Sequence, residues 1–413
     1  MNSKLINLLK KSNLLKAVWK MPTRIQKGYW YKFLYPLIYK LNARAAVDPD
    51  KVIFVERRYD TIQDSLKLLY GDLKKNYDFT IHTHCLNQDF ASSRSYRRSC
   101  RRLVRDLATA GVVFLSDANE VVSCLPLKKD TKVTQTWHAC GAFKRFGIST
   151  GDYLFGESTK EQRRFPKYKN LSLVTVSSPE VVWAYEEAMD LRDHPGVVSP
   201  VGVSRTDVFF DRNRAERAYQ KLYHLFPAAK GKKVILYAPT YRGWASRAQA
   251  PERLDYEMFS KALGDSYVMV VKQHPLIKSR PPIEGAAGDF ARDLSESLSI
   301  EDLLMVSDIC ISDYSSIIFE YALLERPMLF FAYDLDDYND WRGFYYPFEE
   351  MTPGPVCTTN EEMIRWISRI DETFDRETVT AFREKFMSAC DGHATRRILE
   401  KTFGASRLDC YHK

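Results

Sequence analysis

The chain has 413 residues, more than one average domain holds, so we expect two domains of about 150 to 200 residues each. Hydrophobic residues make up 45% of the chain and charged residues 28%, without low-complexity tracts or solenoid repeats, which excludes disordered, fibrous and repeat architectures. The net charge of +8 comes from residues 1–47, which hold ten Lys or Arg and no acidic residue; the rest of the chain carries −2, which argues against a nucleic-acid-binding body.

Residues 1–47 form a basic segment that is also rich in leucine and aromatic residues. Leucines recur at roughly helical spacing from Leu5 to Leu15, and aromatic residues cluster between Trp19 and Tyr35. Lysines beside leucines and aromatic rings are typical of a segment that lies at the surface of an anionic membrane. We expect this segment to be helical and to contact the membrane surface through Lys10, Lys11, Lys16, Trp19, Lys20 and Trp30.

The amphipathic period of this segment is imperfect, because Lys16 falls on the leucine side. A basic helix docked on the protein's own body, or a flexible tail, would show the same composition. No run approaches the roughly 18 apolar residues of a spanning helix. No compact apolar core with a small-residue cleavage site follows the basic start. We therefore expect a peripheral protein on the cytoplasmic face of the cell membrane.

Apolar runs and amphipathic stretches alternate along residues 48–210, a pattern that predicts a parallel sheet with covering helices. We predict a first α/β domain here. The stretch 148–170, polar and basic, is expected to be a mobile loop. The predicted strands are 52–55, 78–84, 111–115, 132–137 and 171–176, and the predicted helices are 61–75, 92–109 and 179–189.

The same alternation continues through residues 211–413, after a charged join between about 205 and 231, and predicts a second α/β domain. Helices between 360 and 403 complete it, and the last of them is expected to cross back to the first domain. The predicted strands are 233–238, 267–272, 308–312 and 327–332, and the helices between them are 255–263, 300–306 and 315–324.

Three predicted strands of the second domain end in polar or cationic residues. The run Ile311-Ser-Asp-Tyr-Ser-Ser-Ile-Ile-Phe-Glu320 passes from a strand through a hydroxyl and carboxylate cluster into a helix. Strands 233–238 and 267–272 are followed by Thr240 with Arg242 and by Lys272 with His274. Ligands of open α/β sheets bind at the carboxyl ends of strands, so we expect these residues to converge on a phosphate. An ordinary helix cap would explain the serines equally well.

A fourth strand, in the first domain, leads into Trp137 and His138, followed by a glycine turn and an expected basic helix start. Together with the preceding residues, His138 predicts a cleft for a phosphorylated donor. In this order, the motifs resemble the CDP-glycerol glycerophosphotransferase family of teichoic acid synthesis. The resemblance runs from about Val133 to Val356 and rests on Trp137-His138, Gly202-Val-Ser-Arg205-Thr-Asp207, Tyr237-Ala-Pro-Thr-Tyr-Arg242, Lys272-Gln-His274-Pro275, Ser312-Asp-Tyr-Ser-Ser316, Arg326-Pro327, Arg342-Gly-Phe-Tyr345 and Pro353-Gly-Pro355.

The resemblance implies a GT-B-like fold, with two Rossmann-like domains that face a central cleft. Residues 48–210 would then bind the acceptor and residues 211–413 the CDP donor. The implied reaction transfers glycerol phosphate or ribitol phosphate from CDP-glycerol or CDP-ribitol to a hydroxyl of a polyprenyl-diphosphate-linked saccharide, and releases CMP. Many family members have Trp-His-Gly-Thr-Pro where this chain has Trp137-His138-Ala-Cys-Gly141, a version closer to the ribitol branch.

Two histidines are the candidate catalytic residues. We predict that His138 takes the proton of the acceptor hydroxyl, since an imidazole titrates near neutrality. His274 is expected to contact the pyrophosphate or the leaving phosphate. A structural histidine that bonds the following turn is the alternative for His138.

The remaining candidate residues would bind the donor. Arg205 and Arg242 offer guanidinium forks for phosphate oxygens, and Glu320 is placed to accept bonds from ribose hydroxyls. Asp313 is expected to orient His274, Lys272 or a donor hydroxyl. The full predicted donor set is Arg205, Thr240, Arg242, Lys272, Asp313, Ser315, Ser316 and Glu320.

We expect no metal and no cofactor, because the chain lacks an Asp-x-Asp pair and its cations would neutralise a pyrophosphate. His82 and His84 share one side of a strand, but a third ligand is not evident, which favours satisfied strand histidines over a metal site. The eight cysteines show no close pairing and are interpreted as reduced core residues. A nucleophilic role for Cys140 is the less favoured alternative.

Two further hypotheses compete with the polyol-phosphate transferase. The same cleft would serve a GT-B glycosyltransferase that uses a nucleotide sugar, since a fold does not fix a function. A membrane-bound assembly protein that retains an inactive transferase fold is the third hypothesis, and the presence of His138, His274 and Arg242 speaks against it.

Overall fold

The computed structural model describes residues 21–88, 91–151, 153, 156–243, 248–251, 253–277, 280 and 282–412. The chain forms two compact units. Unit 1 comprises Met1–Gln135, Lys160–Leu173 and Asp409–Lys413, and unit 2 comprises Thr136–Thr159 and Val174–Leu408. The domain limits predicted from the sequence, 48–210 and 211–413, stay a prediction.

Unit 1 is built on four parallel strands in the order β2-β1-β3-β4. Every neighbouring pair is parallel, as the alternation of strands and helices predicted. The elements are α3 (Met21–Lys27), η1 (Gly28–Leu34), α4 (Tyr35–Asn42), β1 (Asp48–Glu56), α5 (Asp64–Asn76), β2 (Thr80–Cys85), α6 (Ser93–Leu107), β3 (Ala110–Leu115), α7 (Glu120–Ser123), β4 (Lys132–Gln135) and α8 (Thr159–Arg164).

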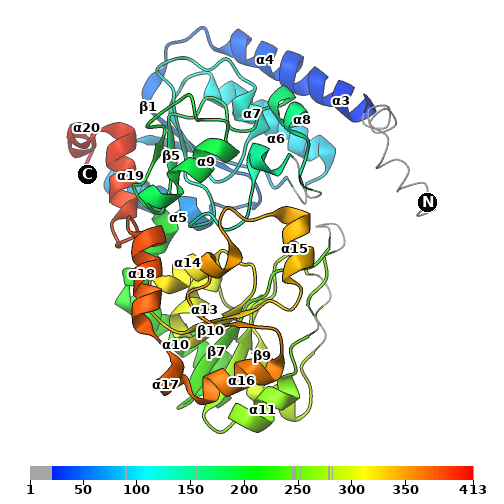
Figure 1. The fold of residues 1–413 in the computed structure, drawn as a ribbon. Helices are drawn as coiled ribbons and strands as arrows, with labels where there is room; N and C mark the ends of the chain where they lie inside the picture. Colours follow the sequence, from blue (N-terminus) through cyan, green and yellow to red (C-terminus); the bar gives the residue numbers. More distant parts are fainter. Residues whose placement is uncertain are drawn as a thin grey trace. The chain divides into compact units, whose positions relative to one another are not determined.

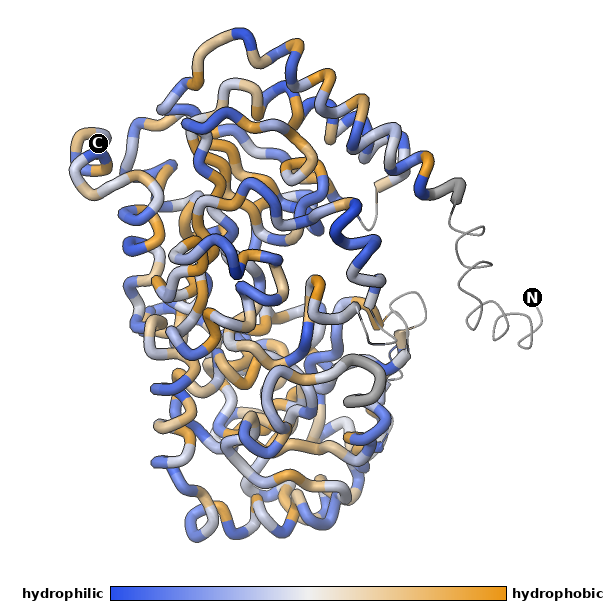
Figure 2. Tube along the Cα trace, turned by 45° about the horizontal axis from the view of Figure 1, so that its top comes forward, coloured by the Kyte–Doolittle hydropathy of each residue, from blue (hydrophilic) through white to orange (hydrophobic). Residues whose placement is uncertain are grey.

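Strand β1 has a helix layer on each of its two faces, because successive side chains point to opposite sides of a sheet. Ile53 and Val55 lie in a core cluster with residues of α4, α6 and α7. On the other face Phe54 stacks on Phe114 at 5.0 Å between ring centroids and meets Tyr70 of α5 edge-on at 5.5 Å. In Figure 2 apolar segments run through the interior of each unit, and polar segments alternate with them along the helices.

Residues Met21–Asn42 are helical throughout and expose five large apolar side chains. The middle stretch, Gly28–Leu34, is π-helical. Four residues make slightly more than one turn of an α-helix, which has about 3.6 residues per turn, and slightly less than one turn of the wider π-helix. Side chains four residues apart therefore rotate about the helix axis in opposite directions in the two kinds of segment, and the two rotations offset each other. The five residues therefore stay near one face and form an apolar stripe: Ile25 (65% exposed), Tyr29 (51%), Phe33 (60%), Leu37 (41%) and Leu41 (59%).

Of the residues predicted to face the membrane, Trp30 lies within the described part of the chain. Trp30 does not belong to the apolar stripe; it packs against the core cluster of unit 1 and lies under the guanidinium of Arg97, 4.9 Å from the ring centroid. Lys10, Lys11, Lys16, Trp19 and Lys20 lie outside the described residues. None of the helices in the described ranges has the length and apolar composition that a membrane crossing needs.

Unit 2 contains a six-stranded parallel sheet in the order β12-β11-β10-β7-β8-β9 and the parallel strands β5 and β6. Its strands and helices up to the end of the sheet are η2 (Gly147–Thr150), β5 (Leu173–Thr175), η3 (Pro179–Val181), α9 (Val182–Ala188), β6 (Val198–Ser199), η4 (Ser204–Phe210), α10 (Arg212–Leu225), η5 (Pro227–Ala229), β7 (Lys233–Tyr237), α11 (Tyr256–Leu263), β8 (Tyr267–Val271), α12 (Ala286–Phe290), β9 (Ala291–Asp293), α13 (Ile300–Val306), β10 (Ile309–Ser312), α14 (Ile317–Ala322), β11 (Met328–Phe331), α15 (Leu335–Arg342), η7 (Phe348–Met351) and β12 (Val356–Cys357).

Five helices follow β12: α16 (Asn360–Ser368), α17 (Ile370–Thr373), α18 (Arg376–Met387), α19 (Ala394–Phe403) and α20 (Ala405–Cys410). Helices α11, α12 and α16 cover the face of the six-stranded sheet that holds Ile235, Met269 and Ile311. Helices α13 and α14 contact β7 and β10, and α10 packs on α13 (Figure 1). The chain is thus an α/β protein with parallel sheets, as predicted.

Two parts of the fold differ from the prediction. The stretch 148–170 is not a loop throughout, because α8 lies within it and buries Glu161 and Gln162. Strands β6, β9 and β12 were not predicted, since each has only two or three residues and shows too little periodicity. The last residues, Asp409–Lys413, belong to unit 1, where Tyr411 stacks on Phe79 at 4.7 Å.

Gly202 offers a test of the packing in unit 2. Its φ is +90°, and a Cβ atom there would lie 2.2 Å from the carbonyl oxygen of Ala389. Gly202→Ala should therefore lower the free energy of unfolding by more than the roughly 1–2 kcal/mol of a left-handed backbone alone. Gly196→Ala is the matched control, with φ of +85° and no atom within 4 Å of the added Cβ, and should lose only that smaller amount. Equal losses in urea unfolding would contradict the packing argument.

Candidate active site

The predicted donor residues of the second domain follow β7, β8 and β10, which are neighbours in the order β10-β7-β8. All three strands are parallel, so their carboxyl ends share one edge of the sheet. Thr240 and Arg242 follow β7, Lys272 and His274 follow β8, and Asp313 follows β10. The structure thus brings these residues to one edge, as the strand pattern predicted.

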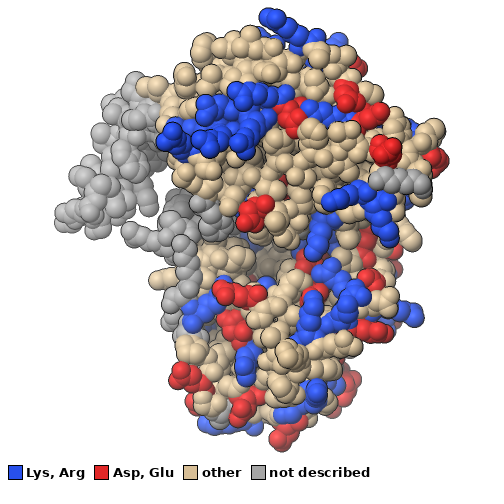
Figure 3. Space-filling model, turned by 180° about the vertical axis from the view of Figure 1, so that it is seen from behind, with Lys and Arg blue, Asp and Glu red and all other residues tan. Residues whose placement is uncertain are grey.

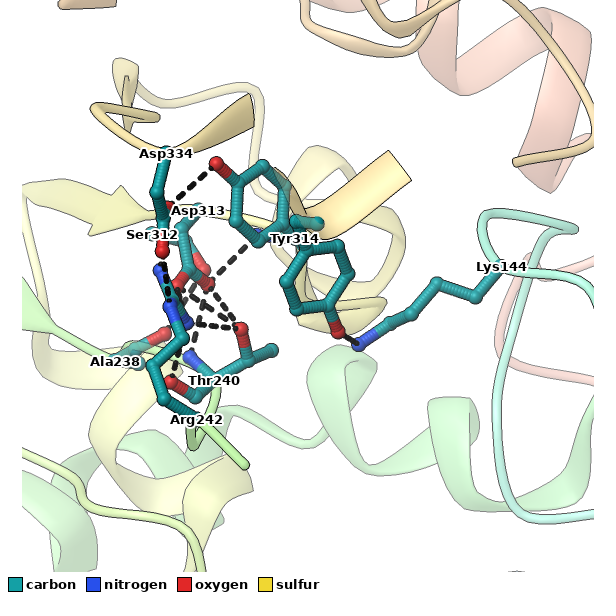
Figure 4. Close-up of polar contacts among 9 residues, drawn as sticks. Lys144, Ala238, Thr240, Arg242, Ser312, Asp313, Tyr314 and Asp334 are labelled. Atoms are coloured by element: carbon teal, nitrogen blue, oxygen red, sulfur yellow. Dashed lines mark hydrogen bonds and ion pairs between the residues drawn. The ribbon is translucent and has the colours of Figure 1, made fainter. Parts of the chain in front are cut away.

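The carboxylate of Asp313 is the centre of this edge (Figure 4). It is 2% exposed. Its Oδ1 accepts hydrogen bonds from the backbone N–H of Thr240 (2.8 Å) and of Tyr314 (2.6 Å). Its Oδ2 accepts bonds from the Thr240 hydroxyl (2.9 Å) and from Nη1 of Arg242 (2.9 Å). We expected Asp313 to orient His274, Lys272 or a donor hydroxyl; in the structure it holds Thr240 and Arg242, and the donor hydroxyl stays a prediction.

Arg242 joins the ends of three strands. Its Nε and Nη2 donate to Asp334, which follows β11, at 2.6 and 3.0 Å, and its Nη1 donates to Asp313. Burial alone would lower the pKa of Arg242, but Asp313 and Asp334 outweigh it and raise the pKa, so the guanidinium stays charged. The fork expected to bind phosphate is thus occupied by two carboxylates here. The guanidinium also lies over the ring of Tyr314, 5.2 Å from its centroid.

Lys272 and His274, which follow β8, both have defined hydrogen-bond partners. Nζ of Lys272 donates to the backbone carbonyls of Ser295 and Leu298, both at 2.7 Å, and burial lowers the pKa of this lysine. Nδ1 of His274 accepts the backbone N–H of Leu276 at 3.2 Å. A neutral His274 ring therefore carries its proton on Nε2, which makes that atom a donor.

His138 lies in a tight turn between β4 and η2. Trp137, just before it, has a φ of +56°, an unusual backbone for a bulky residue, and its ring packs on the imidazole at 4.4 Å. Gly141 closes the turn with a φ of +62°, and a Cβ there would lie 2.2 Å from the ring of Phe319. The turn therefore packs directly on α14, the helix that follows the Ser312–Ser316 motif.

Hydrogen bonds hold this turn from both sides. Nη1 of Arg205 donates to the backbone carbonyl of His138 at 3.0 Å. The Tyr185 hydroxyl lies 3.3 Å from the carbonyl of Ala139 and 3.1 Å from that of Gly141. The geometry around His138 is thus set before any ligand binds. The basic helix expected after the glycine is absent from the described residues there, where Lys144 forms an antiparallel bridge with Phe344.

Arg205 and Glu320 belong to a buried ion group next to the turn. Nη2 of Arg205 donates to Glu301 at 3.1 Å and lies 3.7 Å from Glu320. Burial raises the pKa of Glu320, although Arg205 opposes the shift. Glu320 is 2% exposed, so it is not the exposed helix carboxylate that the sequence left open. The structure places Arg205 where it positions His138, a role the sequence did not indicate.

The remaining candidates are two serines and a cysteine. Ser315 and Ser316 are half-buried, and the Ser316 hydroxyl makes no capping bond at the start of α14, whereas Ser315 accepts the backbone N–H of Ile317 at 3.4 Å. Cys140 is buried, and burial raises the pKa of its thiol, which disfavours a nucleophile. Sequence reasoning missed Asp334 and Lys144; the amine of Lys144 donates to the hydroxyl of Tyr338 at 3.0 Å (Figure 4).

The strand histidines of unit 1 share one carboxylate. Nδ1 of His82 and Nε2 of His84 both lie 2.8 Å from Oδ2 of Asp106, and Lys51 pairs with Oδ1. The histidines are therefore hydrogen-bonded, which agrees with the satisfied arrangement favoured from the sequence. Within the described part of the chain, no group of three or more His, Cys, Asp or Glu is arranged to hold a metal ion.

Known proteins resemble this chain over most of its length. The teichoic acid ribitol-phosphate primase of Bacillus spizizenii is 33% identical over 383 residues, which cover 92% of this chain and 96% of that protein. The teichoic acid poly(ribitol-phosphate) polymerase of the same organism is 33% identical over 376 residues, and the chain spans 58% of its length. The teichoic acid glycerol-phosphate primase of Bacillus subtilis is 32% identical over 282 residues, which cover 68% of this chain and 70% of that protein.

A solved structure shares the fold. That of the wall teichoic acid polymerase TagF matches with a TM-score of 0.72 and 24% identity, and covers 96% of this chain and 97% of that one. The sequence profile described as CDP-Glycerol:Poly(glycerophosphate) glycerophosphotransferase matches residues 37–404. That range includes every donor-site residue named above and the turn of His138. The chain therefore belongs to the CDP-glycerol glycerophosphotransferase family.

Proposed function

We propose that the protein transfers ribitol phosphate from CDP-ribitol to a hydroxyl of a lipid-linked acceptor in teichoic acid synthesis, and releases CMP. Membership of the family supports a CDP-polyol donor. The ribitol-phosphate primase that matches over 96% of its length supports ribitol over glycerol. The observation that carries the proposal is the turn of His138, which packs on α14 directly after the Ser312–Ser316 motif.

The reaction needs one proton removed and one leaving group stabilised. The acceptor oxygen attacks the phosphorus that bears the polyol and loses its proton to His138. The bond from that phosphorus to the bridging pyrophosphate oxygen breaks, and CMP leaves with the electron pair. His274, whose neutral ring has its proton on Nε2, is oriented chemically to donate a hydrogen bond or proton to that oxygen. Lys272, Ser315 and Ser316 would balance the remaining charge.

Arg205 and Arg242 have supporting roles in this proposal. Both are held by carboxylates, Arg205 by Glu301 and Arg242 by Asp313 with Asp334. Arg205 would position His138 through its carbonyl. Arg242 would hold Thr240 and Asp313 in place around the CDP donor. It would contact phosphate directly only through N–H groups that are not bonded to Asp313 or Asp334. Glu320 would act on Arg205 and not on a ribose hydroxyl. A GT-B-like arrangement with a donor-binding C-terminal domain remains part of the proposal.

We propose that the apolar stripe of Met21–Asn42 lies in the surface of an anionic membrane, on its cytoplasmic face, where a polyprenyl-linked acceptor resides. Five large apolar side chains in one row are costly to expose to water. Burial of each would contribute roughly 1.5–3 kcal/mol if complete. Lys40 and Arg44, both exposed near the end of the stripe, would lie near lipid phosphates.

His138→Ala should lower transfer by about 10²–10⁴-fold, the usual contribution of a general base, with the thermal unfolding temperature unchanged. The measurement is CMP release from CDP-ribitol and CDP-glycerol, with UDP release from UDP-sugars in parallel. CMP from CDP-ribitol alone supports the proposal. UDP release would favour the glycosyltransferase, and a wild-type protein without turnover would favour the inactive assembly protein.

His274→Gln keeps a donor group but has no transferable proton. We expect kcat to fall about 10²-fold or more and KM for CDP-ribitol to change little, because the proton is needed only in the transition state. A raised KM with an unchanged kcat would instead make His274 a residue that only binds the pyrophosphate.

The double substitution Phe33→Ser, Leu37→Ser should weaken sedimentation with vesicles of anionic phospholipid by at least about tenfold, because two apolar side chains no longer enter the lipid. Tyr59→Ser is the control, an apolar ring 39% exposed elsewhere on unit 1, and should leave sedimentation unchanged. Undiminished vesicle binding of the double variant would remove the stripe as the docking face.

A further inference from the structure

Helix α6 carries six arginines on its solvent side, at intervals of one, three or four residues. In a helix with about 3.6 residues per turn these positions share one face. Cys100, Leu103, Val104 and Leu107 occupy the opposite face and are buried in the unit 1 core. Figure 3 shows Lys and Arg side chains gathered into a continuous patch over this part of unit 1. We call these residues the arginine ridge: Arg94, Arg97, Arg98, Arg101, Arg102 and Arg105.

The charges of the arginine ridge are not neutralised by the protein. In the described part of the chain no carboxylate lies within ion-pair distance of any of the six, whereas Arg205, Arg242 and Arg397 each pair with at least one carboxylate. Arg97 lies over the Trp30 ring, and Nε of Arg101 donates to the backbone carbonyl of Arg97 at 3.3 Å. The one acidic residue of α6, Asp106, is engaged with His82, His84 and Lys51.

This arrangement opposes the stability of α6 itself. Like charges three or four residues apart repel each other on a helix. The first turn of α6 has no acidic residue to complement the helix dipole, and Arg94 stands near that positive end. A bound anion with several charges would relieve this repulsion and so stabilise α6.

We propose that the arginine ridge binds the phosphodiester backbone of a polyol-phosphate chain, carried by the acceptor or the growing product. The proposal rests on the proposed function, which makes such a chain the enzyme's own product. Guanidinium forks match phosphate oxygens with two parallel hydrogen bonds. Forks repeated along about three turns of helix, each about 5.4 Å long, fit a row of phosphates better than a single one.

Other polyanions fit this surface less well. No large hydrophobic side chain of α6 is exposed, so the ridge has nothing to insert into lipid, unlike the apolar stripe. Tyr96, the only aromatic residue of α6, is half-buried against the unit 1 core and presents no platform on which a nucleic-acid base would stack. A phosphodiester chain without bases or acyl chains matches what α6 offers.

The consequence for the enzyme is retention of longer acceptors. An acceptor with several polyol phosphates gains contacts along the ridge that an acceptor with one does not. The wild type should therefore have a lower KM for the longer acceptor at low salt. The advantage should shrink as salt rises, because bound phosphates must displace counterions from the ridge.

The test compares two triple variants of the full chain. Arg98→Gln, Arg102→Gln, Arg105→Gln should weaken binding of a fluorescent, soluble ribitol phosphate oligomer, without CDP donor, by at least about tenfold at low salt. Lys67→Gln, Lys74→Gln, Lys75→Gln removes three exposed charges from α5 of the same unit and should change binding less than about twofold. The ridge variant should unfold no earlier than wild type, because it loses repulsion within α6.

Each outcome decides the question. Undiminished oligomer binding by the ridge variant overturns the inference, and so does a defect confined to vesicles of anionic phospholipid, which would assign the ridge to lipid. Equal losses in both triple variants would show a general charge effect and overturn it too. Turnover with a single-phosphate acceptor should be equal in all three proteins. If wild type shows no turnover but the ridge variant alone loses oligomer binding, the proposed function fails and the surface stands.

Discussion

The site depends on the buried carboxylate of Asp313. It receives two backbone N–H groups, a hydroxyl and a guanidinium, and through Arg242 it is joined to Asp334. These contacts tie the residues after β7, β10 and β11 to one another. Removal of one partner from a buried ion pair leaves a charge uncompensated, at a cost of about 3–5 kcal/mol. The loops that carry Thr240 and the Ser312–Ser316 motif therefore keep one conformation without a ligand.

A second buried group does the same for the turn of His138. Arg205 holds the carbonyl of His138 and is itself held by Glu301, while Tyr185 bonds the carbonyls that follow. Such groups stabilise less than their Coulomb energy suggests, because both charges lose water. Their contribution is geometric: they fix the backbone of the turn that carries the His138 imidazole. An enzyme that must align an alcohol, a phosphorus and a leaving group gains rate from that preorganisation.

The strand ends and the α/β class were predictable, because apolar runs followed by polar residues mark the ligand edge of a parallel sheet. The partners of those residues were not. Arg242 was assigned to phosphate, yet its partners Asp313 and Asp334 lie 71 and 92 residues away, and no local pattern connects them. Whether the Glu320 carboxylate is buried or exposed could not be predicted either, because its burial depends on which residues pack over α14. The basic character of the helix at 92–109 was visible in the sequence, but the absence of carboxylate partners around its six arginines depends on the packing of distant residues.

Residues 411 and 412 bear on how the protein forms. Tyr411 stacks on Phe79 and donates to Asp50, and His412 bridges Tyr77, so an early part of unit 1 is completed by residues more than 300 positions further along the chain. During synthesis the surface around Phe79 must stay uncovered until Tyr411 has been made. Contacts across more than 300 positions also slow folding, because a long loop closes before they stabilise anything. Nascent chains of this protein should accordingly depend on chaperones until Tyr411 has left the ribosome.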